Sequence, residues 1–266
     1  MLSLLLGCVV FLALMAGLFV PLELFFPAHE GKSSPRAMAL AAVLFVLNTF
    51  LMQWLGVPVL SLISLPRTPS PLIIAFVFFA SDFFGYWMHR AMHRVPLLWR
   101  FHSLHHDAHE TTWLDAWRQH PLDFVLHGIA VGVPGALLGA SLSDLASVVV
   151  LRKAFTTFLH ANVRVKFGWF GWVLASPEFH RHHHSADPRH FDRNFAGTFP
   201  LWDIVFGTHV DVAGGERSED AVAHDAAGAA RGLVGLRDGA EGSTDAAGPH
   251  AAGDLRGTGR HVAAAQ

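Results

Sequence analysis

The sequence has a single cysteine, Cys8, and few charged side chains. One cysteine forms neither a disulfide framework nor a thiolate metal site, so any bound metal would need nitrogen or oxygen ligands. The formal net charge of -2 provides no basic field, and we expect no nucleic-acid partner. Charged residues make up only 15% of the 266 residues whereas 52% are hydrophobic, which predicts that much of the chain lies in a lipid bilayer.

Three long apolar segments predict membrane-spanning helices. They cover residues 1–22, 37–60 and 70–88. At a rise of about 1.5 Å per residue, each is long enough to cross the hydrocarbon core. The first lacks the basic start and the small-residue cleavage site of a secretory signal, so we expect it to be retained as a helix.

Two further apolar runs, residues 124–140 and 141–160, are joined by a short Gly/Ser turn and predict a helical hairpin. Arg152 and Lys153 lie in the middle of the second arm, where a charge is costly unless it faces protein, water or headgroups. A full hairpin and a shallow, re-entrant one both remain open.

Basic residues predict the orientation in the membrane. They occur between the first two spans and after the third, at Lys32, Arg36, Arg90, Arg94, Arg100 and Arg118. The positive-inside rule places both regions in the cytoplasm. Because a hairpin leaves and returns to one face, residues 89–120 and 160–209 then lie on the same side. The expected fold is an all-α integral membrane bundle, with about three spans plus a helical hairpin and a cytoplasmic histidine-rich cap.

Three regions are expected along the chain. Residues 1–69 would hold the N-terminal membrane helices, and residues 70–212 the catalytic domain. Residues 213–266 are rich in Ala and Gly without apolar periodicity, and such a segment buries too little surface to offset its ordering entropy. We therefore expect a disordered tail.

Histidine is the most over-represented residue type, and 14 of the 19 histidines fall between His89 and His190. Three short motifs, here called the histidine boxes, repeat a spacing of three or four residues, which places their members on one helical face. The boxes contain His89 and His93; His102, His105 and His106; and His180, His183 and His184. Eight converging imidazoles exceed what one tetrahedral ion uses, so the pattern predicts two metal ions.

Other polar residues are candidates for the same site. His120 begins the hairpin and His160 ends it, so each is a candidate ligand or supporting residue. Asp82 lies two helical turns before His89 and would accept a proton from a ligand imidazole. Weaker candidates for that supporting role are Asn162 and Asn194, together with Asp123, Glu178, Asp192 and Asp203. His182 points away from the face of its box.

The motifs "SDFFGYWMHRAMH", "LWRFHSLHH", "RQHPLDFVLHG", "FLHANVRV", "SPEFHRHHHS" and "LWDIVFGT" resemble, in this order, the sterol desaturase and fatty acid hydroxylase superfamily over residues 70 to 210. The resemblance implies a non-haem di-iron centre that uses O₂ and two electrons to hydroxylate or desaturate a lipid C–H bond. It places metal ligands at the eight box histidines, and His120 and His160 match further histidines of the superfamily.

The chain shows no glycine fingerprint for flavin or nicotinamide, and one cysteine cannot hold an iron–sulfur cluster. Electrons would come from a separate partner, either cytochrome b5-like or a ferredoxin with its reductase. The alternative is a membrane metal transporter or metal-binding protein that uses the same histidines. Transport sites usually lie near the bilayer midplane, whereas the boxes lie beyond the predicted span ends.

Overall fold

The computed structural model describes residues 1–31, 33–65, 71–107, 111–140 and 142–210, all within one compact unit, Met1–Asp225. These residues form helices and no strands, as the sequence predicts. The tail predicted at 213–266, and Lys32 in the orientation argument, lie outside the described residues.

The α-helices are α1 (Leu2–Phe25), α2 (Pro35–Leu51), α3 (Val57–Leu62), α4 (Pro71–Arg94), α5 (Pro96–His106), α6 (Pro121–Leu137), α7 (Leu142–His160), α8 (Pro177–His183) and α9 (Leu201–Val205). Shorter π or 3₁₀ turns are η1 (Met52–Gly56), η2 (Trp113–Trp117), η3 (Gly168–Trp172) and η4 (Pro188–His190).

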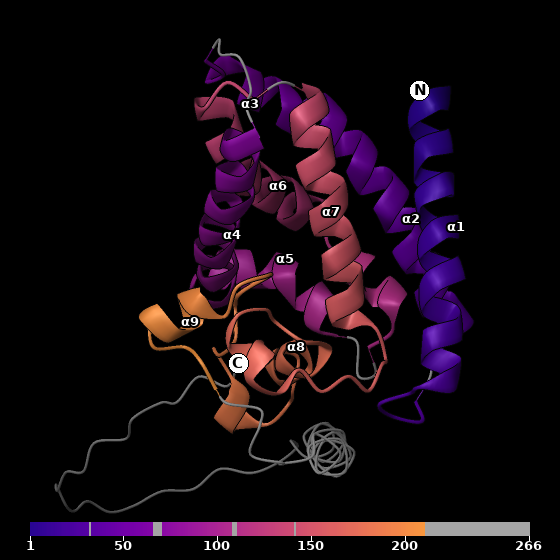
Figure 1. Ribbon diagram of the computed structural model, residues 1–266. Helices are drawn as coiled ribbons and strands as arrows, with labels where there is room; N and C mark the ends of the chain where they lie inside the picture. Colours follow the sequence, from indigo (N-terminus) through magenta and orange to yellow (C-terminus); the bar gives the residue numbers. More distant parts are fainter. Residues whose placement is uncertain (32, 66–70, 108–110, 141, 211–266) are drawn as a thin grey trace, which may run out of the picture. The chain divides into compact units, whose positions relative to one another are not determined.

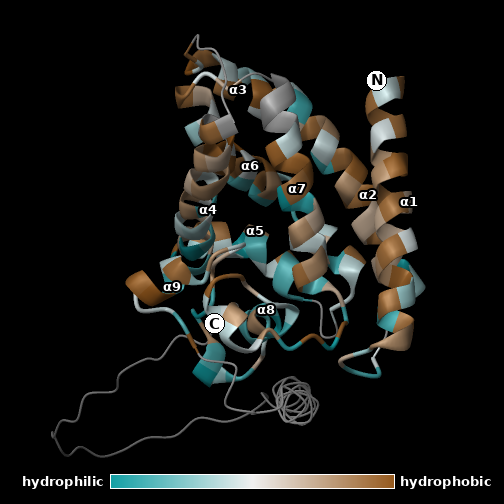
Figure 2. Cartoon of the chain, viewed as in Figure 1, coloured by the Kyte–Doolittle hydropathy of each residue, from teal (hydrophilic) through white to brown (hydrophobic). Residues whose placement is uncertain are grey.

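Two segments are long and apolar enough to cross a membrane. They are α1 and the continuous stretch Pro35–Leu62, which joins α2, η1 and α3. Hydrophobic residues predominate along α1 and α2, whereas hydrophilic ones gather around α5 and α8 (Figure 2). Among the described residues no other helix meets both criteria, so a crossing by α4 stays a prediction. This helix runs without a break through residue 88 to Arg94, and it therefore carries His89 and His93 beyond the predicted span.

The two arms of the predicted hairpin form α6 and α7, but they pack mainly against other elements rather than against each other. The main partner of α6 is α4, whereas α7 packs against η2 and α8 (Figure 1). Glycines explain the position of α6, because a side chain at Gly132 would overlap Leu60 of α3, and one at Gly85 of α4 would press on Val131. The two helices thus do not form a closely packed hairpin.

The N-terminal helices are tied to the polar end of the bundle. Glu23 near the end of α1 accepts backbone N–H groups from Trp113 (2.7 Å) and Asn162 (2.9 Å). The ring of Phe45 in α2 packs edge-on against Trp117, with centroids 4.9 Å apart. At that end α5, α8 and α9 gather below the ends of α4 and α7 (Figure 1). This arrangement places the histidine boxes together at one end of the helices.

Candidate metal centre

Proline and serine residues direct the histidine helices toward one another. Pro96 lacks the N–H that would continue α4, so the chain turns into α5 after Val95. Ser176 caps α8 by accepting the N–H of Phe179, with Pro177 at the first helical position. The helix α5, of about three turns, and the short helix α8 thereby bring the second and third boxes beside the first.

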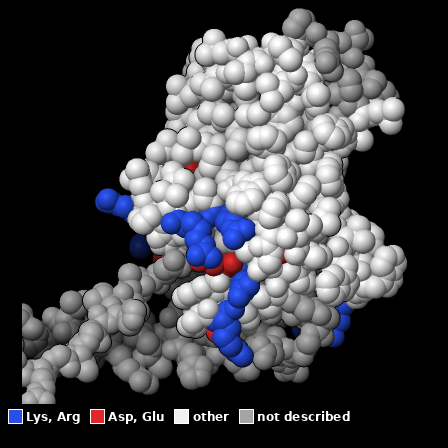
Figure 3. Space-filling view, turned by 90° about the vertical axis from the view of Figure 1, so that its left-hand side faces the viewer, with Lys and Arg blue, Asp and Glu red and all other residues white. Residues whose placement is uncertain are grey.

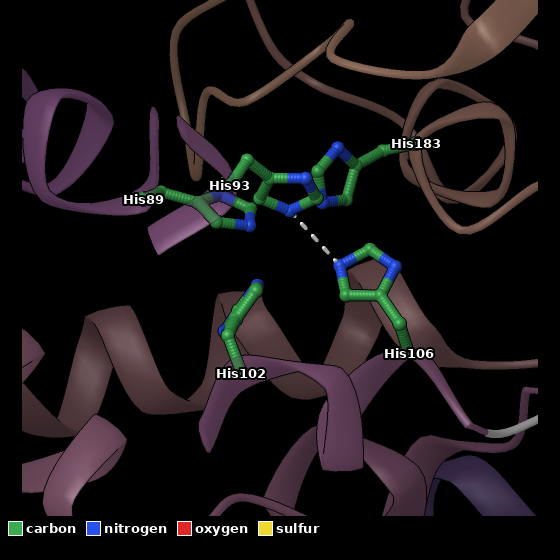
Figure 4. Close-up of side chains that lie close together, drawn as sticks. All are labelled: His89, His93, His102, His106 and His183. Carbon is green, nitrogen blue, oxygen red and sulfur yellow. Dashed lines mark hydrogen bonds between the residues drawn. The ribbon is translucent and has the colours of Figure 1, made fainter. Parts of the chain in front are cut away.

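Nine histidines form two groups whose ligand atoms lie within 4.8 Å of one another inside each group. Group one contains His89, His93, His102, His106 and His183, and group two contains His105, His160, His180 and His184. The five rings of group one point into a common space from α4, α5 and α8 (Figure 4). The rings of His106 and His184 stack with centroids 4.3 Å apart, so the two groups are direct neighbours.

Each five-residue box is divided between the two groups. In α5, His102 and His106 face group one while His105 faces group two. In α8, His183 faces group one while His180 and His184 face group two. The paired spacing therefore supplies imidazoles to two adjacent groups.

Hydrogen bonds orient several of the rings. The Nδ1 atoms of His89, His183 and His160 donate to the carbonyls of Phe195 (2.9 Å), Arg193 (2.7 Å) and Thr156 (2.9 Å), respectively. A ring that donates from Nδ1 presents the lone pair of Nε2. In group one, the buried Nε2 atoms of His89 and His183 have no other partner among the described residues. Buried lone pairs without a donor are the arrangement expected of metal ligands.

The spacing of the Nε2 atoms also fits a metal. In group two, Nε2 of His160 lies 3.0 Å from Nε2 of both His105 and His180, and Nε2 of His180 lies 3.1 Å from that of His184. Two ligands at right angles, each bonded at roughly 2.1 Å, would lie about 3.0 Å apart. The same distance, 3.1 Å, separates Nε2 of His93 from Nε2 of His106 in group one.

The electrostatic environment keeps these imidazoles neutral. Burial, followed by the charges of neighbouring imidazoles, holds the pKa of His89, His106, His180 and His184 well below the ordinary value of 6.5. Burial also lowers the pKa of His183 to about 3, although its bond to the Arg193 carbonyl opposes this shift. Neutral imidazole is the form that binds a metal ion, so the groups are ready to do so at pH 7.

His160 lies in group two, but the structure does not bring His120 to either group. Nδ1 of His120 accepts the N–H of Leu122 at 3.2 Å and caps α6, and its ring packs against Phe101. His182 is also outside both groups, as predicted, with its ring 4.7 Å from that of His190.

The sequence suggested Asp82, Asn162 and Asn194 as hydrogen-bond partners of the ligand histidines, but in the structure these three residues contact other groups. Asp82 binds Arg152 (3.2 Å) and the N–H of Phe199 (2.9 Å) rather than a ligand histidine. Asn162 binds the backbone of Ala28 and His29. The side chain of Asn194 bonds to the backbone of Phe179 and Val210. The prediction of direct contact with a ligand is wrong for each, because these polar groups satisfy backbone groups from distant segments.

Two weaker candidates from the sequence do approach histidines of group one: Oδ1 of Asp192 lies 3.7 Å from Nδ1 of His93, and the other is Asp123. Its Oδ2 accepts from Nδ1 of His102 at 3.1 Å. His127, one turn later on α6, was not singled out, and its ring lies 6.4 Å from that of His89. Its signal in the sequence is a titratable residue within an otherwise apolar helix.

A family model for fatty acid hydroxylases matches residues 74–208, which is just over half of the chain. The chain belongs to the fatty acid hydroxylase family. The match contains both groups of histidines, as well as Asp123 and His127. No solved structure matches the chain.

The chain is similar to several curated proteins whose names describe enzymes that act on lipids. An alkylglycerol monooxygenase of Xenopus tropicalis is 27% identical over 180 residues, covering 66% of this chain and 36% of the relative. The ornithine lipid hydroxylase OlsE of Rhizobium tropici is 32% identical over 129 residues, covering 48% and 39%. A very-long-chain aldehyde decarbonylase of Oryza sativa subsp. indica is 32% identical over 164 residues, covering 59% and 60%. The chain thus spans less than two thirds of the length of these relatives.

Proposed function

We propose that this protein is a membrane-bound, O₂-dependent oxidoreductase that hydroxylates or desaturates a C–H bond of a lipid at a two-iron centre. The observation that carries the proposal is the convergence of nine histidines on two adjacent groups. The relatives named above support the lipid substrate, and the two apolar helices support a membrane location.

His89, His93, His102, His106 and His183 would hold one iron, and His105, His160, His180 and His184 the other. Iron bound there would supply the activation of O₂ that side chains alone cannot perform. The protein's own contribution is to fix the rings. Asp123 and the carbonyls of Phe195 and Arg193 each receive an Nδ1–H, which leaves Nε2 for the metal.

Phe195 would exclude water from the first group. Its ring lies 5.0 to 5.5 Å from the rings of His89, His93 and His183, and the residue is 1% exposed. Asp203 holds this segment in place by accepting the N–H groups of Phe195 and Ala196, both at 2.8 Å. A dry wall next to the metal site limits side reactions with water.

The electron donor would be a separate protein, cytochrome b5-like or a ferredoxin with its reductase, acting at a cytoplasmic face. On the face shown in Figure 3, Lys and Arg gather in the lower half, near the histidine end, and the upper part carries almost no charge. Arg94 belongs to this end of α4 and is paired with Asp192 at 3.2 Å. Such placement of basic residues favours the cytoplasmic side.

Metal analysis tests the proposal most directly. Detergent-purified protein from iron-supplied cells should contain about two irons per chain, and His183→Ala should lose iron because an inner ligand is missing. The iron-loaded protein, given reductant and O₂, should convert an added lipid into a product that carries oxygen or a new double bond. Full iron retention in His183→Ala would show that the assignment is wrong.

A further inference from the structure

Two polar side chains meet inside the bundle at a glycine of α4. A Cβ atom placed on Gly85 would lie 3.3 Å from Nη2 of Arg152 on α7 and 3.7 Å from Nε2 of His127 on α6. The guanidinium and the imidazole therefore both approach the backbone of α4 at Gly85. We call Gly85, His127 and Arg152 the Gly85 subsite.

The guanidinium of Arg152 is fixed in this position. Its Nη1 donates to Oδ1 of Asp82 at 3.2 Å, while Oδ2 of Asp82 accepts the N–H of Phe199 at 2.9 Å. Asp82 is fully buried, and the Arg152 side chain is 12% exposed. Among the described residues Nη2 makes no hydrogen bond, so the atom nearest Gly85 keeps its donors for another group. The ion pair thus orients Arg152 without using all of its hydrogen-bonding capacity.

His127 has unused hydrogen-bonding capacity as well. Within the part of the chain that the structure describes, neither ring nitrogen forms a hydrogen bond, although the residue is partly buried at the α4–α6 contact. The nearest carboxylate on its own helix, Asp123, is bonded to His102. Polar groups enclosed in a bundle are normally paired, and titratable residues in such helices usually mark a functional site.

The subsite lies next to group one. Gly85 precedes His89 by four residues, which places both on one face of α4 about 6 Å apart along the helix axis. The rings of His89 and His127 have centroids 6.4 Å apart. A group held at Gly85 is therefore separated from the metal ligands by only a few covalent bond lengths.

We propose that His127 and Arg152 bind an acceptor oxygen of the lipid substrate, within a few bonds of the carbon that is oxidised. The proposal rests on the proposed function and specifies its substrate class. An ether, hydroxyl or carboxylate oxygen would receive hydrogen bonds from Nη2 of Arg152 and from the imidazole N–H. A plain methylene chain at this position would leave both donors unsatisfied, which is costly in an enclosed site. The favoured substrates are lipids that react close to a polar end rather than in mid-chain.

Binding without turnover tests the proposal. Iron-loaded protein in detergent, kept free of O₂, is equilibrated with three radiolabelled probes: 1-O-hexadecylglycerol, hexadecanoate and n-hexadecane. We expect His127→Leu and Gly85→Ala each to weaken binding of an oxygen-bearing probe by about tenfold, since each removes or blocks a hydrogen bond. Binding of n-hexadecane should not change. Whichever oxygen-bearing probe responds shows whether the oxygen is neutral or anionic.

His127→Leu does not touch the Asp82–Arg152 pair, so a purely structural pair would not produce its effect. Gly17→Ala in α1 is the matched control, because its Cβ would meet no atom within 4 Å. Unchanged binding of both oxygen-bearing probes, or equal loss for n-hexadecane, would overturn the proposal. Iron content is measured on the same samples, so absence of iron from the unmodified protein would instead count against the proposed function.

Discussion

Nδ1 of His102 lies 3.1 Å from Oδ2 of Asp123, and both side chains are buried. The contact joins a histidine of group one on α5 to the first turn of α6, where a carboxylate is also favoured by the helix dipole. It fixes the ring of His102 so that Nε2 faces group one.

We expect Asp123→Asn to lower the iron affinity of group one by roughly 10- to 100-fold, because the negative charge behind His102 is lost. Competition with a coloured iron chelator measures this change. Asp107→Asn is the control, since Asp107 is largely exposed and pairs with Arg118 instead of a ligand. Equal affinities in the two variants would mean that Asp123 does not support the metal.

Group two should depend on His160. His160→Ala removes the imidazole whose Nε2 is 3.0 Å from both His105 and His180, and we expect a loss of about one iron per chain. His182→Ala should keep both irons, because His182 faces His190 outside either group. Elemental analysis of the two purified variants distinguishes these outcomes, and similar iron contents would contradict the division into groups.

The sequence suggested His120 as a metal ligand, and substitutions at this position test that assignment. In the structure it caps α6, so His120→Ala should retain both irons and reduce the free energy of unfolding by about 1 kcal/mol. His120→Asn, which restores a side-chain acceptor, should recover most of that stability. Thermal unfolding followed by tryptophan fluorescence, together with iron content, separates a capping role from a ligand role. Loss of iron in both variants would restore His120 as a ligand.

The metal-free protein should become less stable in acid. Burial lowers the pKa of His183 to about 3, so between that value and 6.5 the unfolded chain binds more protons than the folded one. The free energy of unfolding should therefore fall as the pH falls from about 6.5, with further contributions from His89 and His180, whose pKa values are also lowered. Denaturation midpoints measured from pH 7.5 to pH 5 check the sign. A midpoint that rises on acidification would contradict it.

Local spacing was enough to find most of the candidate site. A helix repeats every 3.6 residues, so His102, His105 and His106 had to share one side of α5, and the number of such residues indicated two ions. His160 was also found, because the ends of the apolar runs placed it at the same interface as the boxes. The all-helical fold and the two long apolar segments followed in the same way from composition and length.

The hydrogen-bond partners of the clustered histidines could not be predicted from residue spacing. Asp82 is two turns from His89 on one helix, yet it faces Arg152 and Phe199, which come from segments at least 70 residues away. Which member of a box joins which group, and why Asp123 rather than Asn162 or Asn194 supports a ligand, depends on how α5, α6 and α8 approach one another. The sequence by itself determined the helices and most of the histidines that converge, since these depend on local periodicity and composition. Tertiary structure alone decided the partners of each ring and the meeting of His127 with Arg152 at Gly85, because these contacts depend on the close approach of helices that are distant in the chain.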